Sequence, residues 1–150
     1  THGYKSFSKG EARDIFKLKN EYFNLSFLPL ICYEIIYSGK MSKKNNFDVI
    51  INISEDGWFG DSIGPYQHFS HSIFRAIEEG KNIVRSSNNG VSAFIDPYGR
   101  VLKEIKSTQS GVIEVKKFEI VKETLFSKNG KNIFFYFLLF YISLIFFLKK

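Results

Sequence analysis

FDVIINISEDGWFGDSIGP, residues Phe47–Pro65, decides the fold of this 150-residue chain. Its first seven residues, Phe47–Ile53, are apolar almost without interruption and rich in β-branched side chains, which is typical of a strand buried on both faces. The residues that follow, Ser54–Pro65, hold three glycines and are predicted to form the loop at the end of that strand. A strand, a helix, a further strand and a meander follow one another along the chain, and this order predicts an α/β sandwich.

The loop leads into a predicted helix. Pro65 suits its first turn, apolar side chains recur at helical spacing, and Gly80 can end it, so we predict a helix over about 66–79. Three short strands joined by tight turns are predicted next: Asn82–Arg85, Val91–Ile95 and Val101–Ile105. We expect Gly111–Val115 to be the last strand and 116–132 to be a polar connection.

A second apolar run, Leu25–Ile31, predicts a strand that delivers Cys32, the one cysteine of the sequence. With a single cysteine, neither an intrachain disulfide nor a Cys-based zinc cluster can form. Tyr33 and Glu34 follow it, and a cysteine at a strand end beside a carboxylate can be an activated nucleophile. On these three residues alone, a buried and unreactive cysteine is the more common outcome.

The composition and the spacing of charged residues argue against some functions. The 21 basic and 15 acidic side chains give a net charge of +6, which by itself suits nucleic acid, anionic lipid or no specific partner. The basic residues are scattered and form no Arg-rich stripe or aromatic RNA-binding motif, so we expect no nucleic-acid partner. His68 and His71 lie three residues apart on the predicted helix without a third ligand, so a packed or solvated pair is favoured. We expect neither a metal nor a cofactor.

Three segments together resemble the carbon-nitrogen hydrolase (nitrilase) superfamily from Leu28 to Arg100 and on through Val115: PLICYEIIY, FDVIINISEDGWFGDSIGPYQH and FRAIEEGKNIVRSSNNGVSAFIDPYGR. Within them, GWFGDSIGPYQH and the Glu two residues after the Cys are similar to apolipoprotein N-acyltransferases. The resemblance implies an αββα sandwich, of which this chain would hold the C-terminal part.

The resemblance also implies a mechanism. Cys32 would attack an acyl ester of a phospholipid, form a thioester, and pass the acyl chain to the N-terminal amine of a diacylglyceryl-modified cysteine on a bacterial apolipoprotein. The backbone N–H of Tyr33 would donate to the oxyanion, and Glu34 would support the nucleophile. Trp58 and Phe59 would offer apolar walls to the lipid, although anchoring their own loop is an equally good interpretation.

Other family positions are interpreted as scaffold: Arg75, Glu78, Arg85 and the turn Asn88–Gly90, which should require a positive φ. Glu55 stands where the family usually has Asn, which changes the hydrogen bonding of the loop. In the family, a general-base Glu and a Lys lie upstream of the position that matches Thr1. The chain starts without an initiating Met, so we expect an upstream polypeptide to carry the rest of the site.

The C-terminal tail, Ile133–Leu148, reads IFFYFLLFYISLIFFL and is apolar on every face. It predicts one transmembrane helix that flanking lysines would lengthen. We therefore divide the chain into a catalytic part (1–120), a linker (121–132) and a transmembrane helix (133–148). The resemblance implies a place in the bacterial inner membrane, with the catalytic domain periplasmic.

Two other functions stay open. An amidase of the same superfamily, hydrolysing small carbon-nitrogen substrates, would leave the apolar tail unexplained. A non-catalytic, membrane-anchored remnant would keep the tail and lose the chemistry, and the residues do not exclude it.

Overall fold

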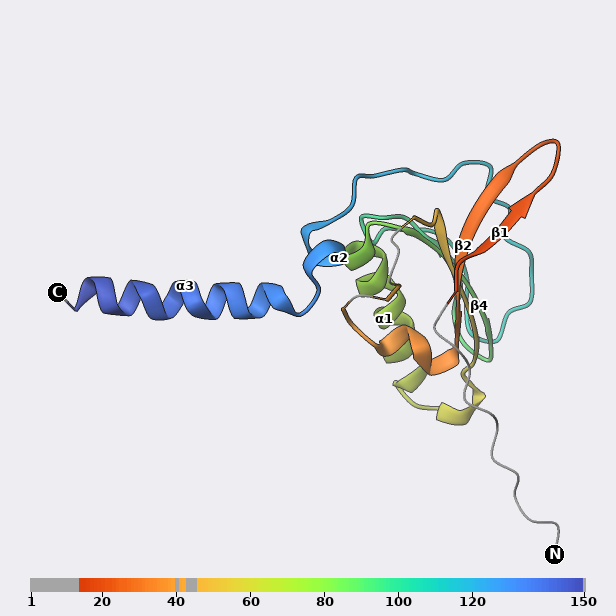
Figure 1. The fold of residues 1–150 in the computed structure, drawn as a ribbon. Coiled ribbons are helices and arrows are strands. Elements are labelled where there is room, and N and C mark those ends of the chain that lie inside the picture. The colour runs from red at the N-terminus through yellow and green to blue at the C-terminus, as the bar shows by residue number, and fades with distance from the viewer. Residues whose placement is uncertain (1–13, 40, 43–45, 150) are drawn as a thin grey trace, which may run out of the picture.

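The computed structural model describes residues 14–39, 41–42 and 46–149. A single six-stranded sheet in the order β1-β2-β3-β4-β5-β6 forms its centre, and helix α1 covers one face of it (Figure 1). The elements are β1 Phe16–Lys19, β2 Asn24–Ile31, η1 Cys32–Ile36, β3 Val49–Glu55, η2 Gly57–Phe59, α1 Gly64–Glu79, β4 Asn82–Asn88, β5 Ser92–Ile95, β6 Val101–Ile105, α2 Leu125–Asn129 and α3 Asn132–Leu148.

The three central strands, β2, β3 and β4, run parallel, and the flanking strands pair antiparallel. Ile50 of β3 pairs with Leu28 on one side and Ile83 on the other, and all three side chains are fully buried in the core that includes Ala76 of α1. Parallel strands bring their carboxyl ends to one edge of the sheet, so the residues that follow β2 and β3 lie side by side.

The predicted α/β class is confirmed, and β2, β3, α1, β4, β5 and β6 lie where the sequence predicted them, with some ends shifted by two or three residues. Helix α1 has Pro65 in its first turn and ends at Gly80, whose φ of +63° is left-handed. The strand predicted over Gly111–Val115 is wrong: the structure describes no strand there, and Val112 is 95% exposed. The sequence analysis also missed β1 and α2.

The face of the sheet opposite α1 is partly uncovered. Ile31 and Ile53, which pair in register, are 63% and 54% exposed. The segment after β6 covers the far end, where Phe118 packs edge-on against Phe94 of β5. The structure therefore confirms a mixed α/β sheet with one helical layer, and its described residues hold no second sheet of the expected sandwich.

Helix α3 extends away from the sheet as a single helix (Figure 1), and none of its side chains is buried. Its 17 residues span about 25 Å at 1.5 Å per residue, against about 30 Å for the hydrocarbon core of a bilayer. Among the residues the structure describes, no helix is long and apolar enough to cross a membrane. The predicted transmembrane helix over 133–148 is therefore not supported.

Candidate active site

Cys32 directly follows β2 and is the first residue of the short 3-10 helix η1. Its φ of +48° is left-handed, which is uncommon for a residue other than glycine. The side-chain amide of Asn52, on the adjacent strand β3, donates to the carbonyls of Leu30 at 3.1 Å and Cys32 at 3.5 Å. This bridge fixes the turn at the carboxyl edge of the sheet, where the thiol is partly exposed.

The thiol contacts a chain of polar groups. Ser54 Oγ lies 3.6 Å from Cys32 Sγ and donates to Asp56 Oδ1 at 2.7 Å. The same Asp56 oxygen lies 2.8 Å from His68 Nδ1, and the other lies 2.7 Å from an amino group of Arg85. Asp56, His68 and Arg85 are all buried, so a buried charge network reaches the Cys32 thiol through one hydroxyl.

Arg85 is the centre of this network. Besides Asp56, it donates to the side-chain oxygen of Asn52 and to the carbonyl of Val91. It therefore reaches Cys32 by two routes, through Asn52 to the backbone and through Asp56 to the thiol. Burial lowers the pKa of Arg85 and the Asp56 carboxylate opposes that change. A buried guanidinium is stable only when it is paired and hydrogen-bonded in this way.

Asp56 is held as a carboxylate. Burial alone would raise its pKa, but hydrogen bonds from His68 and Ser54 and the charge of Arg85 outweigh burial and hold the pKa well below its usual range. Gly90 makes room for it, because a Cβ at that position would overlap the carboxylate. The positive φ predicted for this turn is found at Asn89 (+56°) and not at Gly90. Glycine is needed at position 90 because Asp56 approaches its backbone closely.

Three of the predicted supporting residues lie in the turn that begins at Cys32 or pack against it. Glu34 accepts the backbone N–H of Ile31 at 2.8 Å, which ties η1 to the end of β2. The Tyr33 ring stacks on His68 with 5.2 Å between centroids, and Phe59 contacts both rings at 6.0 and 5.6 Å. Trp58 is instead 86% exposed. The structure thus places Tyr33 and Glu34 in the turn that begins at Cys32 and packs Phe59 against Tyr33, while their chemical roles stay predictions.

Glu55, the departure from the family pattern, ties the loop to the turn after β4. It accepts the N–H of Gly57 at 2.6 Å and the side-chain amide of Asn88. These hydrogen bonds, that from Asn88 first, lower the pKa of Glu55. The loop's hydrogen bonding is therefore satisfied with a glutamate at this position.

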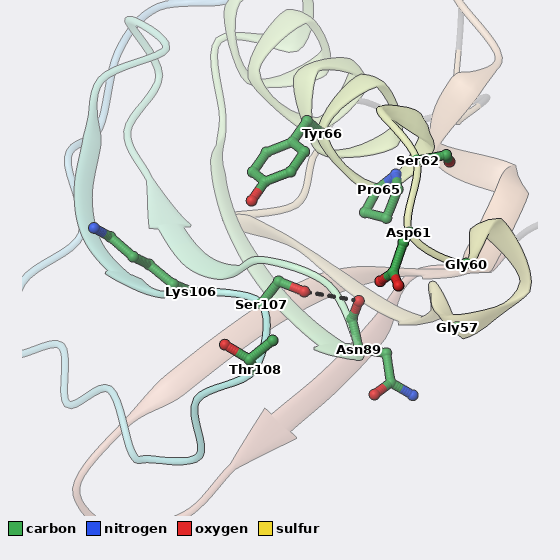
Figure 2. Close-up of a pocket in the computed structure, with 10 residues that line it drawn as sticks. All are labelled: Gly57, Gly60, Asp61, Ser62, Pro65, Tyr66, Asn89, Lys106, Ser107 and Thr108. Atoms are coloured by element: carbon green, nitrogen blue, oxygen red, sulfur yellow. Dashed lines mark hydrogen bonds between the residues drawn. The ribbon is translucent and has the colours of Figure 1, made fainter.

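A cavity of about 540 Å³ opens on another side of the same loop (Figure 2). Asp61 and Tyr66 face it from the loop and α1, and Lys106 and Thr108 line it from the segment after β6. Cys32 is not one of its lining residues, so the cavity is separate from the thiol.

The sequence analysis missed Asn52, Ser54 and Asp56 as site residues, although a signal was present. These polar residues occupy every second position where β3 ends, and alternate residues of a strand share one face. Arg85, interpreted as scaffold, belongs to the same group. No cluster of three His, Cys, Asp or Glu side chains able to hold a metal occurs in 14–39, 41–42 and 46–149, and His68 is engaged by Asp56.

The structure is thus a mixed α/β sheet that presents a partly exposed cysteine, Cys32, at its carboxyl edge. Residues 5–116 match the carbon-nitrogen hydrolase family, and the chain belongs to that family.

The chain is similar to curated apolipoprotein N-acyltransferases. That of Rickettsia bellii is 42% identical over 149 residues, covering 97% of this chain and 29% of the relative. That of Wigglesworthia glossinidia brevipalpis is 39% identical over 140 residues, covering 91% and 28%. That of Agrobacterium fabrum is 46% identical over 90 residues, covering 59% and 17%. The resemblance is confirmed, and the chain spans less than a third of the length of these relatives.

Among solved structures, an amidase from Nesterenkonia sp. has a TM-score of 0.50 at 17% identity, covering 68% of this chain and 40% of that one. A variant of the Nesterenkonia AN1 amidase, from the nitrilase superfamily, has a TM-score of 0.50 at 16% identity with the same coverage. At this identity the likeness shows the fold alone, a nitrilase-like α/β sheet.

Proposed function

We propose that this chain is the nucleophile-bearing part of an apolipoprotein N-acyltransferase, which moves an acyl chain from a phospholipid to the N-terminal amine of an apolipoprotein. The observation that carries the proposal is Cys32, held at a left-handed φ by Asn52 and contacted by Ser54 at the carboxyl edge of the sheet. The names of the similar acyltransferases indicate the acyl acceptor.

The proposed reaction has two halves. The Cys32 thiolate attacks the carbonyl carbon of the phospholipid acyl ester, the ester bond breaks, and the lysophospholipid alcohol leaves with a proton. The acceptor amine then attacks the Cys32 thioester, the amide bond forms, the amine loses a proton, and the thiolate is regenerated. The backbone N–H of Tyr33 would stabilise the oxyanion in both halves, and Glu34 would hold η1 in place.

The surroundings of Cys32 suit an apolar substrate. Tyr33, the residue after Cys32, forms an aromatic cluster with Phe59 and His68, and we propose that this cluster contacts the acyl chain. Trp58, exposed at the tip of the loop, would meet lipid there. The enzyme would act at the bacterial inner membrane with this domain in the periplasm, and the exposed apolar side chains of α3 support contact with lipid.

The proposal includes a longer protein, or an upstream polypeptide, that supplies the family's general-base Glu and its Lys. A free thiol is only a few per cent ionised at pH 7, so Cys32 needs a base to react at a useful rate. Losing both an adjacent base and an oxyanion donor leaves little activity above background, because such groups act as a unit. The chain alone should therefore be inactive.

The test gives the longer protein a phospholipid with a labelled acyl chain and measures hydroxylamine-sensitive label on Cys32. We expect wild type to form the thioester and Cys32→Ser to lose it, because an unactivated hydroxyl is a much weaker nucleophile. Val112→Ser, at a 95% exposed side chain, is the control and should label as wild type does.

Acylation of Cys32→Ser at the wild-type rate would refute the role of Cys32. Labelling of the chain alone at catalytic rates would refute the need for upstream groups. Hydrolysis of small amides without transfer to an amine would instead favour the amidase, for which the structural likeness supports the fold only.

A further inference from the structure

We infer that Ser54 is a positioning residue for Cys32: its hydroxyl turns its one proton from Asp56 to the sulfur when Cys32 ionises, and so stabilises the thiolate. The inference rests on the proposed function for its meaning, because it matters to catalysis only if Cys32 is the nucleophile.

Ser54 is the group that connects the thiol to the buried carboxylate. Its Oγ lies 3.6 Å from Cys32 Sγ and 2.7 Å from Asp56 Oδ1. Both contacts are within hydrogen-bonding range for sulfur and oxygen, and a hydroxyl rotates about its C–O bond to suit its partners.

The single hydroxyl proton decides what Ser54 can do. While Cys32 is a thiol, Ser54 donates to the charged Asp56, and the S–H can donate weakly to Ser54 Oγ. Once the thiol has lost its proton, the sulfur is a charged acceptor, and Ser54 can donate to it instead. The S–H bond breaks when solvent or a base takes the proton, and the turn of the Ser54 hydroxyl that follows makes and breaks only hydrogen bonds.

Asp56 tolerates the loss of that donor because it has others. His68 Nδ1 lies 2.8 Å from one carboxylate oxygen, and Arg85 lies 2.7 Å from the other. Arg85 also balances the charge, since a thiolate and a carboxylate joined by one hydroxyl would otherwise repel each other. The buried network is thus arranged so that Ser54 is the donor free to move.

The other ionisable groups around Cys32 cannot replace Ser54. Glu34 on η1 uses its side chain to accept the N–H of Ile31. Tyr33 stacks its ring on His68 of α1, and Arg85 of β4 reaches the thiol only through Asp56 and Ser54.

The experiment uses the complete 150-residue chain in detergent, where Cys32 is the one cysteine and its alkylation by iodoacetamide is unambiguous. The alkylation rate is measured from pH 5 to 10. We expect Ser54→Ala to move the midpoint of this profile upward by about one pH unit and to slow alkylation at pH 7 about tenfold, because hydrogen bonds to a charged acceptor are about twice as strong as neutral ones. Ser87→Ala is the matched control, because Ser87 also lowers the pKa of Asp56 by a hydrogen bond and none of its described bonds reaches Cys32.

Ser54→Thr keeps the hydroxyl and should keep the wild-type midpoint. Ser54→Val has the shape of threonine without the hydroxyl and should show the upward shift. It serves as the test if Ser54→Ala does not fold. An unchanged profile for the variants that lack the hydroxyl overturns the inference, and so does an equal shift in Ser87→Ala. Alkylation does not require acyl transfer. A shifted profile in a protein that fails the acyl-transfer test would therefore support the positioning role while refuting the proposed function.

Discussion

At the scale of single residues, two buried carboxyl groups of this domain have pKa values that are shifted in opposite directions. Asp56 is surrounded by donors, so its pKa falls and it stays charged beside Arg85. Glu79, at the end of α1, is fully buried, and burial first and the charge of Glu78 second raise its pKa from 4.5 to about 7, against the attraction of Arg75 and Lys81. The first arrangement keeps a charged carboxylate one hydroxyl away from Cys32, and the second costs stability at neutral pH.

Glu79 therefore predicts a pH dependence of stability. Below pH 4.5 both the folded and the unfolded chain bind the proton, so Glu79 contributes no penalty there. Between pH 4.5 and about 7 the unfolded chain releases the proton while the folded chain keeps it, so the free energy of unfolding falls as pH rises through this window. Glu79→Gln, which is neutral at every pH, should be more stable than wild type by about 2–3 kcal/mol at pH 8 and equally stable at pH 4.

Denaturant unfolding at the two pH values measures this difference. Glu104→Gln, on an exposed position of β6, removes one carboxylate from the surface and is the matched control. A gain of the same size at pH 4 and pH 8 would mean that ionisation of Glu79 is not its cause.

At the scale of elements, the sequence predicted those helices and strands whose apolar residues recur at a regular spacing because they are buried. β2, β3 and α1 lie in the buried core, and their apolar patterns predicted them correctly. β1 is exposed at all four positions, so its sequence shows no apolar pattern. α2 has only five residues, and the Thr124 side chain caps it by accepting the N–H of Ser127, so it is too short to show one. The strand predicted over Gly111–Val115 had the right residue types without a partner strand to pair with.

The residues of the candidate site were also predicted only in part. Cys32, Tyr33 and Glu34 were found because a motif places them together in sequence. Asn52 and Arg85 are 33 positions apart in the numbering and meet only because β3 and β4 are adjacent parallel strands. Their contact depends on strand register, which the sequence pattern alone did not specify.

Helix α3 gives a prediction at this scale. None of its side chains is buried, so removing 132–150 should change the free energy of unfolding of the remaining chain by less than about 0.5 kcal/mol. Removing 125–150, which also deletes α2, should destabilise it by about 1–2 kcal/mol, because Ser127 is buried and Thr124 caps α2. Denaturant unfolding of the two truncated chains measures both values. A large loss on removing α3 alone would show that it packs against the domain.

At the scale of the whole molecule, the sheet is covered on one face and partly uncovered on the other. α1 buries the side chains of β2, β3 and β4 on its own face, but Ile31 and Ile53 on the opposite face remain more than half exposed. The chain also covers less than a third of the length of its similar relatives. The two observations agree with the longer protein proposed above, and we propose that its additional residues pack on that face, as the second sheet of a sandwich would.

Ile53 tests that packing. In the isolated chain its side chain is 54% exposed, so Ile53→Lys should lower the free energy of unfolding by at most about 1 kcal/mol, the range of strand propensities. In the longer protein proposed here, the same lysine would be buried against the added sheet, where an unpaired charge is costly, and the loss should reach about 3 kcal/mol or more. Ile120→Lys, at a side chain that is 93% exposed in the segment after β6, is the matched control. Unfolding of both variants in both proteins gives the comparison. Equal losses for Ile53→Lys in the chain and in the longer protein would mean that this face stays open to solvent, and the general base and Lys would then have to reach Cys32 from another side.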